Sequence, residues 1–154
     1  MTRTLRILTT FSLVLLLGLP SIAQGDDKDL YRDGSVYRVT MVRTEANSMD
    51  DYLEQLSRMY MPIMKAAQEA GLIKSYKLLT GGYSNMDDFD LMLLVEIENM
   101  AALDETPERE AKWKAVREKV RASLGQDAED EIQATYRKIR SIQGSKLMRE
   151  QILR

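Results

Sequence analysis

The sequence predicts a single α+β domain, and three observations support this fold class. Segments rich in β-branched and apolar residues alternate with segments whose apolar residues recur every three or four positions. Their order along the chain is strand, helix, strand, strand, helices, strand. The third predicted strand is apolar on both faces, so it needs cover on both sides.

The first 23 residues are predicted to be a cleavable signal peptide. Arg3 and Arg6 precede an apolar run of about 13 residues, which is shorter than the roughly 20 needed to span a bilayer. Pro20 and the small residues Ser21 and Ala23 follow, as expected near a cleavage site. We therefore expect an exported protein, periplasmic or extracellular, with no stable membrane span after cleavage.

The charged residues 24–34 are predicted to be a flexible lead-in, and residues 35–154 to be the folded domain. A first strand is predicted from the β-branched residues of 36–43. Ser48 then begins a helix whose apolar stripe continues to Ala70. Pro62 predicts a kink near residues 58–62, and Gly71 the end of the helix.

Two strands are predicted to follow this helix. Residues 72–80 alternate apolar and polar side chains before a Gly-Gly turn, and residues 89–97 form the third strand. On the third strand the odd-numbered positions from Phe89 to Ile97 are apolar, and Met92 and Leu94 add apolar side chains to its other face. Met92 and Leu94 are therefore predicted to lie in an interface.

The C-terminal third is predicted to contain helices and one last strand. Thr106 and Pro107 are a typical helix start, and a buried stripe leads to Leu124. A second helical stripe is predicted from Ile132 to Ile142, closing at Gly144. We predict a strand over 145–153, with a helix that continues to the end as the competing interpretation.

This order of elements is that of the ferredoxin-like β-α-β-β-α-β fold, an antiparallel sheet covered by helices on one face. The other face would remain open. Because Met92 and Leu94 make that face apolar, we expect two copies to pack sheet to sheet in a homodimer.

Three segments give the chain a resemblance to the dimeric α+β barrel superfamily, which includes the antibiotic-biosynthesis monooxygenase-type and NIPSNAP-type domains. They are the opening strand VYRVTMVRT, the long helix with Pro62 inside it and Gly71 after it, and the strand LMLLVEIENM. The resemblance is architectural and implies the fold. Members of the superfamily range from cofactor-free oxygenases and isomerases to haem-degrading enzymes, so the resemblance implies no single chemistry.

The complete absence of His and Cys restricts the chemistry most strongly. It excludes Ser-His-Asp and Cys-His catalysis, imidazole or thiolate zinc sites and histidine-ligated haem. Asp87, Asp88 and Asp90 lack the spacing of a calcium loop and are interpreted as a solvated turn. No metal and no cofactor are expected.

The charge distribution gives no argument for nucleic acid as a partner, since the chain is mildly acidic. Basic residues gather after Ile132, where Glu150 is the one acid. We interpret this segment as a solvated basic helix face. Association with an anionic envelope surface is the alternative.

A ligand site is expected between the helices and the sheet, or between the two sheets of a dimer. An arginine within an apolar strand can bind an anionic group, and tyrosine and tryptophan can orient an aromatic one. The candidate residues are Arg38, Tyr60, Tyr76, Tyr83 and Trp113.

Two functions remain open on the sequence. The first is a non-catalytic dimer that binds a small or apolar ligand, or a partner. The second is a cofactor-free oxygenase or isomerase acting on an aromatic or polyketide-like substrate, which Arg38, Tyr76 or Trp113 would orient, with no identifiable general base.

Overall fold

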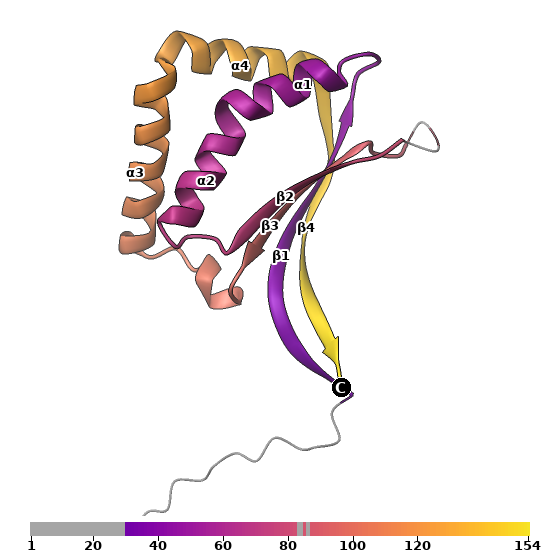
Figure 1. Ribbon diagram of the computed structural model, residues 1–154, viewed down its shortest axis with the longest axis vertical. Helices are drawn as coiled ribbons and strands as arrows, with labels where there is room; N and C mark the ends of the chain where they lie inside the picture. Colours follow the sequence, from indigo (N-terminus) through magenta and orange to yellow (C-terminus); the bar gives the residue numbers. More distant parts are fainter. Residues whose placement is uncertain (1–29, 83–84, 86) are drawn as a thin grey trace, which may run out of the picture.

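The computed structural model describes residues 30–82, 85 and 87–154. The predicted signal peptide, most of the predicted lead-in, and Tyr83 lie outside these residues. The chain forms an α+β fold with a four-stranded antiparallel sheet and helices gathered on one side of it (Figure 1). The sheet order is β2-β3-β1-β4, which is compatible with a ferredoxin-like arrangement.

One of the two inner strands of the sheet is β1, Tyr31–Thr44. It pairs on one side with β3, Leu91–Ile97, and on the other with β4, Arg140–Leu153. The short strand β2, Ser75–Thr80, completes the sheet beside β3. Because β1 begins at Tyr31, residues 31–34 belong to the sheet and extend, with the end of β4, beyond β3 (Figure 1).

The first helical segment bends without breaking, as predicted from Pro62. It consists of α1, Met49–Gln55, a π-helical turn, Leu56–Tyr60, and α2, Met61–Glu69. Within the turn the Met61 N–H donates to the Leu56 carbonyl, five residues back. Pro62 has no N–H to donate, and a single wider turn before it keeps the chain helical.

The segment ends at Gly71, which has a positive φ of 68°. Gly71 N–H donates to the Gln68 carbonyl at 3.0 Å, and Leu72 N–H donates to the Ala67 carbonyl at 2.9 Å. This pair of hydrogen bonds is a Schellman motif, which satisfies carbonyls that the helix end would otherwise leave free.

The second helical segment consists of α3, Pro107–Leu124, and α4, Gln126–Ile139, after a 3₁₀ turn at Met100–Leu103. The predicted start is confirmed, since Thr106 Oγ1 accepts a hydrogen bond from the Arg109 N–H at 3.2 Å. Gly125 separates the two helices, which turn sharply there (Figure 1). Arg121 holds this corner by donating from Nε and Nη2 to the carboxylate of Glu129.

The boundary between α4 and β4 differs from the prediction. The helix ends at Ile139 and the strand begins at Arg140, so Ile142 and Gly144 lie on β4 and not on a helix. The predicted last strand is confirmed, but it begins five residues earlier than expected. The basic residues Lys146 and Arg149 therefore lie on a strand as well.

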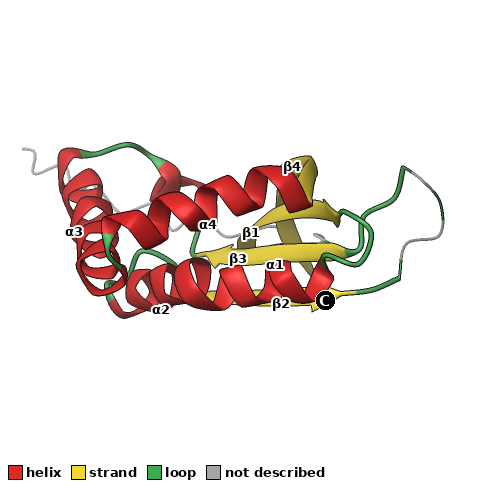
Figure 2. Cartoon of the chain, turned by 90° about the horizontal axis from the view of Figure 1, so that it is seen from above, coloured by secondary structure: helices red, strands yellow, loops and turns green. Residues whose placement is uncertain are grey.

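The helices pack over one face of the sheet in a single layer, in which α1 contacts α4 and α2 contacts α3 (Figure 2). The largest buried cluster joins the strands to these helices. Its members come from β1, β3, α1, the π-helical turn and α4: Val42, Tyr52, Leu56, Leu91, Leu93, Ile132 and Tyr136. A second cluster around Ala67 and Val116 joins α2 to α3.

Among the described residues, no helix combines the length and apolar character needed to cross a bilayer.

Candidate functional site

A cavity of about 790 Å³ lies between the helix layer and the sheet. Leu56, Met59 and Ile63 line it from the first helical segment. Leu93 and Ile142 line it from the sheet. Ligand cavities in proteins commonly have volumes of about 300–1,000 Å³ and mostly apolar walls, so its size and lining suit a small molecule.

The polar end of this cavity is formed by Arg140, the first residue of β4. Its guanidinium carbon lies 4.8 Å from the ring centroid of Tyr136 and 5.5 Å from that of Tyr52. These distances are within the range of cation–π attraction. The change from helix to strand at Ile139 turns Arg140 toward the two tyrosines, which are fixed on α1 and α4.

The tyrosines of the cavity are neutral near pH 7. Burial raises the pKa of Tyr60 to about 12. Burial also raises the pKa of Tyr136, and that of Tyr52, in spite of the nearby Arg140 charge, which favours the phenolate. Each phenol therefore keeps its proton and can donate a hydrogen bond.

The predicted site residues are distributed over two cavities. Tyr60 lines the cavity just described, whereas Arg38 and Trp113 line a second cavity of about 420 Å³ beside α3. Tyr76, like Trp113, packs against the second buried cluster. The structure therefore places Arg38 with Trp113 and keeps both apart from the larger cavity, while Tyr83 is outside the described residues.

The second cavity is more strongly charged than the first. Arg109 and Arg117 lie in its lining with the acids Asp104, Glu105 and Glu110. Arg38 is exposed there, and Arg109 donates to the Leu72 carbonyl at 3.2 Å. Opposite charges within one lining partly compensate each other, so this cavity offers no distinct charge to a ligand.

The sequence did not indicate Arg140, Tyr136 or Tyr52 as site residues. Arg140 belongs to the basic segment that was interpreted as a solvated helix face, and that interpretation is wrong for this residue. Arg140 and Ile142 are two positions apart, so in a strand they share one face. This spacing was the signal that could have identified Arg140.

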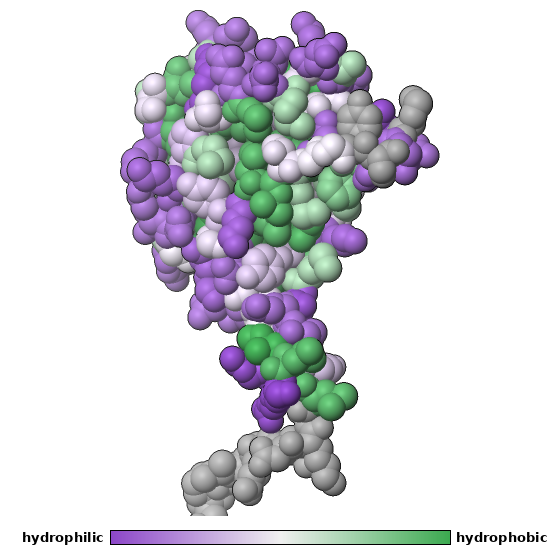
Figure 3. All heavy atoms as spheres, turned by 45° about the vertical axis from the view of Figure 1, so that its right-hand side comes forward, coloured by the Kyte–Doolittle hydropathy of each residue, from purple (hydrophilic) through white to green (hydrophobic). Residues whose placement is uncertain are grey.

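The open face of the sheet carries the predicted interface residues. Met92 and Leu94 are out of phase with the buried Leu91 and Leu93, so they point away from the helices. In the register of the sheet Met92 lies beside Met41 and Leu79, and Leu94 lies beside Val39. Figure 3 shows apolar atoms gathered over the middle of this side of the molecule.

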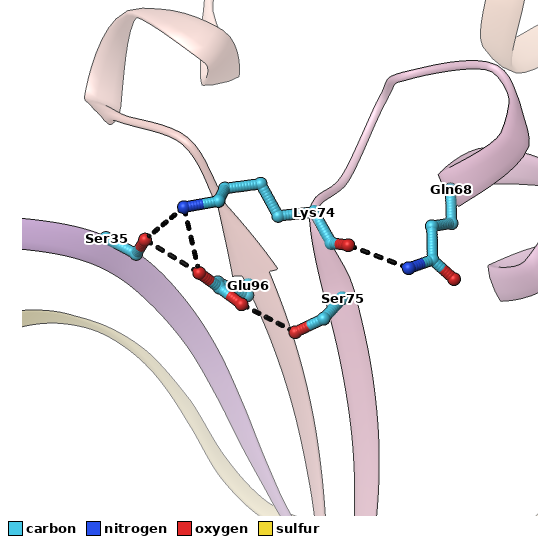
Figure 4. A network of polar contacts seen from close by, with 5 residues as sticks. All are labelled: Ser35, Gln68, Lys74, Ser75 and Glu96. Atoms are coloured by element: carbon cyan, nitrogen blue, oxygen red, sulfur yellow. Dashed lines mark hydrogen bonds and ion pairs between the residues drawn. The ribbon is translucent and has the colours of Figure 1, made fainter.

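One end of the open face holds a polar cluster centred on Glu96 (Figure 4). Ser75 Oγ donates to Glu96 Oε2 at 2.6 Å, and Ser35 Oγ donates to Oε1 at 2.7 Å. Lys74 Nζ lies 3.1 Å from Oε1 and donates to Ser35 Oγ at 2.8 Å. These bonds, those from the two serines first, lower the pKa of Glu96 to about 2.

A lysine amine beside a serine hydroxyl resembles the nucleophile and base of Ser-Lys hydrolases. A base must be neutral to accept the serine proton. The hydrogen bond to Glu96 raises the pKa of Lys74 above its ordinary value, so the amine stays protonated. The cluster is therefore a structural ion pair that joins β1, β2 and β3.

Asp90 is buried and belongs to a structural contact as well. Its Oδ1 accepts the Thr44 N–H at 3.0 Å, and its Oδ2 accepts the Thr44 hydroxyl at 2.5 Å. In the described part of the chain, no group of three or more acidic residues is placed to hold a metal ion.

Neither a scan against protein-family models nor a search of curated proteins finds a match for the chain. The resemblance to dimeric α+β barrel proteins therefore stays a prediction, supported by the arrangement of strands and helices alone.

Proposed function

We propose that the protein is an exported, non-catalytic homodimer of the α+β barrel type that binds a small apolar ligand in the cavity between its helices and sheet. The observation that carries this proposal is the cavity of about 790 Å³ with walls formed by Leu56, Met59, Ile63, Leu93 and Ile142. When an apolar molecule enters such a cavity, its own surface and the apolar walls are both removed from water, which favours binding.

Binding is favoured over catalysis by the chemistry of the cavity lining. The lining has no carboxylate in the part of the chain that the structure describes, and the whole sequence contains no His or Cys. Tyr60, with a pKa of about 12, is a weak candidate for a base, because an efficient general base has a pKa near the working pH. An oxygenase or isomerase would have to take its base from the substrate or from outside this lining.

The dimer of this proposal forms through the open face of the sheet. Val39 is 5% exposed and already covered by its neighbours, while Leu79 and Met148 are about half exposed at the flanks of the same face. A two-fold axis through this face would place like apolar residues of two copies against each other. Export rests on the signal-peptide pattern of residues 1–23.

The ligand proposal is tested with the neutral fluorescent probe N-phenyl-1-naphthylamine, whose emission rises in an apolar site. We expect saturable binding with one site per chain. Met59→Trp narrows the large cavity and should weaken binding by about tenfold or more, a loss of about 1.4 kcal/mol. Met64→Trp is the matched control, because Met64, on α2, is partly buried like Met59 on the π-helical turn but lines the second cavity.

No saturable binding by the unaltered protein would contradict the ligand proposal. A loss with Met64→Trp and none with Met59→Trp would move the site to the second cavity.

The dimer is tested by sedimentation velocity at micromolar concentration. We expect a dimer, and a monomer for Leu94→Asp, since a carboxylate in a dry interface costs several kcal/mol. Met100→Asp is the control: Met100 is 44% exposed but lies on the 3₁₀ turn after β3, and this variant should remain dimeric. A monomeric unaltered protein would refute the dimer while leaving the cavity test unaffected.

A further inference from the structure

Among the described residues, the charge of Arg140 has no counter-charge in the cavity. The described residues of the lining include Arg140 and Arg137 and no acidic residue. Asp90 lies next to Thr44, the strand partner of Arg140, but both its carboxylate oxygens accept hydrogen bonds from Thr44. In the described part of the chain, Arg140 contacts the rings of Tyr52 and Tyr136 and forms no ion pair.

Two buried donors at the same place are also unpaired. Nε of Arg140 and the hydroxyl of Tyr136 are shielded from solvent and have no hydrogen-bond partner among the described residues. A buried polar group without a partner destabilises a fold, and a buried charge does so more strongly. A ligand cannot reach these two shielded atoms, but the Nη atoms of Arg140 are not among the shielded ones and can bind a partner that enters the cavity.

The surroundings of Arg140 also fix its position. The guanidinium packs against two aromatic rings that touch each other and are buried in the main core, Tyr52 at 1% exposure and Tyr136 at 8%. A guanidinium held in this way loses little further freedom when it binds, and its planar donors match the two oxygens of a carboxylate or sulfonate. The site therefore selects for charge and for shape.

We propose that the ligand is an amphipathic anion, with an apolar body that fills the cavity and one carboxylate or similar oxyanion that binds the guanidinium of Arg140. The unshielded Nη atoms of Arg140 are the donors that the anion reaches. This inference rests on the proposed ligand-binding function and narrows its ligand from apolar molecules in general to organic anions.

The test compares two probes that share one aromatic body. N-phenyl-1-naphthylamine is neutral, and 8-anilino-1-naphthalenesulfonate adds a single sulfonate to the same ring system. We expect the sulfonate probe to bind the unaltered protein about tenfold more tightly than the neutral one, as a charge-assisted hydrogen bond provides. Decanoate should displace the bound probe and decanol should not, which would show the same preference for a carboxylate.

Arg140→Gln should remove this preference, reducing sulfonate-probe affinity by about tenfold and changing neutral-probe affinity by less than about threefold. Arg137→Gln is the control, because Arg137 is an exposed cation in the same lining and contributes only general charge. Circular dichroism and thermal unfolding establish that each variant is folded. If Arg140→Gln does not fold, Arg140→Lys keeps the charge but not the planar pair of donors, and it should weaken the sulfonate probe more than the neutral one.

The outcomes separate this inference from the proposed function. If both probes bind equally well and Arg140→Gln changes neither, the anion inference is overturned and the apolar-ligand function stands. An equal loss in Arg137→Gln and Arg140→Gln overturns it too, since the preference then reflects overall charge. If neither probe binds the unaltered protein, both proposals fail.

Discussion

Tyr52 on α1 and Tyr136 on α4 meet edge to face, with ring centroids 5.4 Å apart and an angle of 71° between the ring planes. The pair joins the two helical segments directly above the sheet, where both rings are buried. Such a contact contributes about 0.5–1.5 kcal/mol beyond the burial of the rings. It also forms the wall against which Arg140 packs, so the stability of the helix layer and the polar end of the cavity depend on the same residues.

Tyr136→Phe should leave the free energy of unfolding unchanged or raise it by up to about 1 kcal/mol. The ring contact with Tyr52 stays, whereas the removed hydroxyl is buried and has no partner. Tyr136→Leu, which removes the ring, should lower the free energy of unfolding by about 1–3 kcal/mol. Urea unfolding measures both. A loss above about 1 kcal/mol for the Phe variant would mean that the hydroxyl has a partner in solution.

Gly125→Ala should destabilise the protein by about 1–3 kcal/mol. Gly125 joins α3 to α4 with φ 87° and ψ 148°, a region of backbone space that is essentially limited to glycine. A Cβ here would meet no atom within 4 Å, so the expected loss comes from the backbone alone.

Gly81→Ala is the matched control for that substitution. A Cβ on Gly81 also meets nothing within 4 Å, but Gly81 does not have a positive φ. Its free energy of unfolding, measured by the same denaturant titration, should differ from that of the unaltered protein by less than about 1 kcal/mol. Equal losses at both positions would rule out the backbone explanation.

The stabilising contribution of Glu96 should be lost in acid, so the protein should become less stable as the pH falls. Its folded-state pKa is about 2 and its ordinary value is 4.5, so the unfolded chain takes up a proton first as the pH falls. The contribution of Glu96 is present in full above about pH 5 and is lost between about pH 5 and pH 2. Its size is of the order of 1–3 kcal/mol.

Glu96→Gln should therefore be less stable than the unaltered protein at pH 7, and the difference should shrink as the pH falls from about 5 to about 2. Urea titrations at a series of pH values measure this difference. Glu118→Gln is the control, because Glu118 pairs with Lys114 on the exposed surface of α3. If the difference in free energy of unfolding between the unaltered protein and Glu96→Gln does not change with pH, the cluster does not favour the charged form of the carboxylate.

Asp90→Ala should lower the free energy of unfolding by about 2–3 kcal/mol. The substitution leaves the buried N–H and hydroxyl of Thr44 without the acceptor that fixes the end of β1. Asp90→Asn retains one carbonyl oxygen for the Thr44 N–H, so we expect a smaller loss of about 1 kcal/mol. If the two variants have equal stability in thermal unfolding, this pair of hydrogen bonds does not anchor the strand.

Local signals in the sequence predicted most of the secondary structure. Thr106 and Pro107 mark a helix start, Gly71 marks a helix end, and Pro62 marks the bend, because each acts through its own backbone chemistry. The end of α4 was misplaced because Ile139 and Ile142 are three residues apart, which fits a helix stripe. Pairing with β1 turns this segment into a strand, and no local pattern reports a partner about 100 residues away.

The candidate site was predicted only in part. Tyr60, a candidate for a site between helices and sheet or between two sheets, lies in the lining of the larger cavity, and its role in binding a ligand stays a prediction. Arg38 and Trp113 are brought together, but in the second cavity. Arg140 was not distinguished from the other basic residues near it, since what sets it apart is its contact with two tyrosine rings from distant helices. The sequence contains the side chains, and only the fold brings them together.

The inner position of β1 has a consequence for how the chain folds. Both of its neighbours come much later in the sequence: Val42 pairs with Leu91, and Tyr31 pairs with Leu153. Every pairing of this strand thus requires closure of a long loop, which makes folding slower than in a domain held together by local contacts. During synthesis, the apolar side chains of β1 emerge before the strands β3 and β4 that pair with it. Until both are made, these side chains stay uncovered and accessible to chaperones.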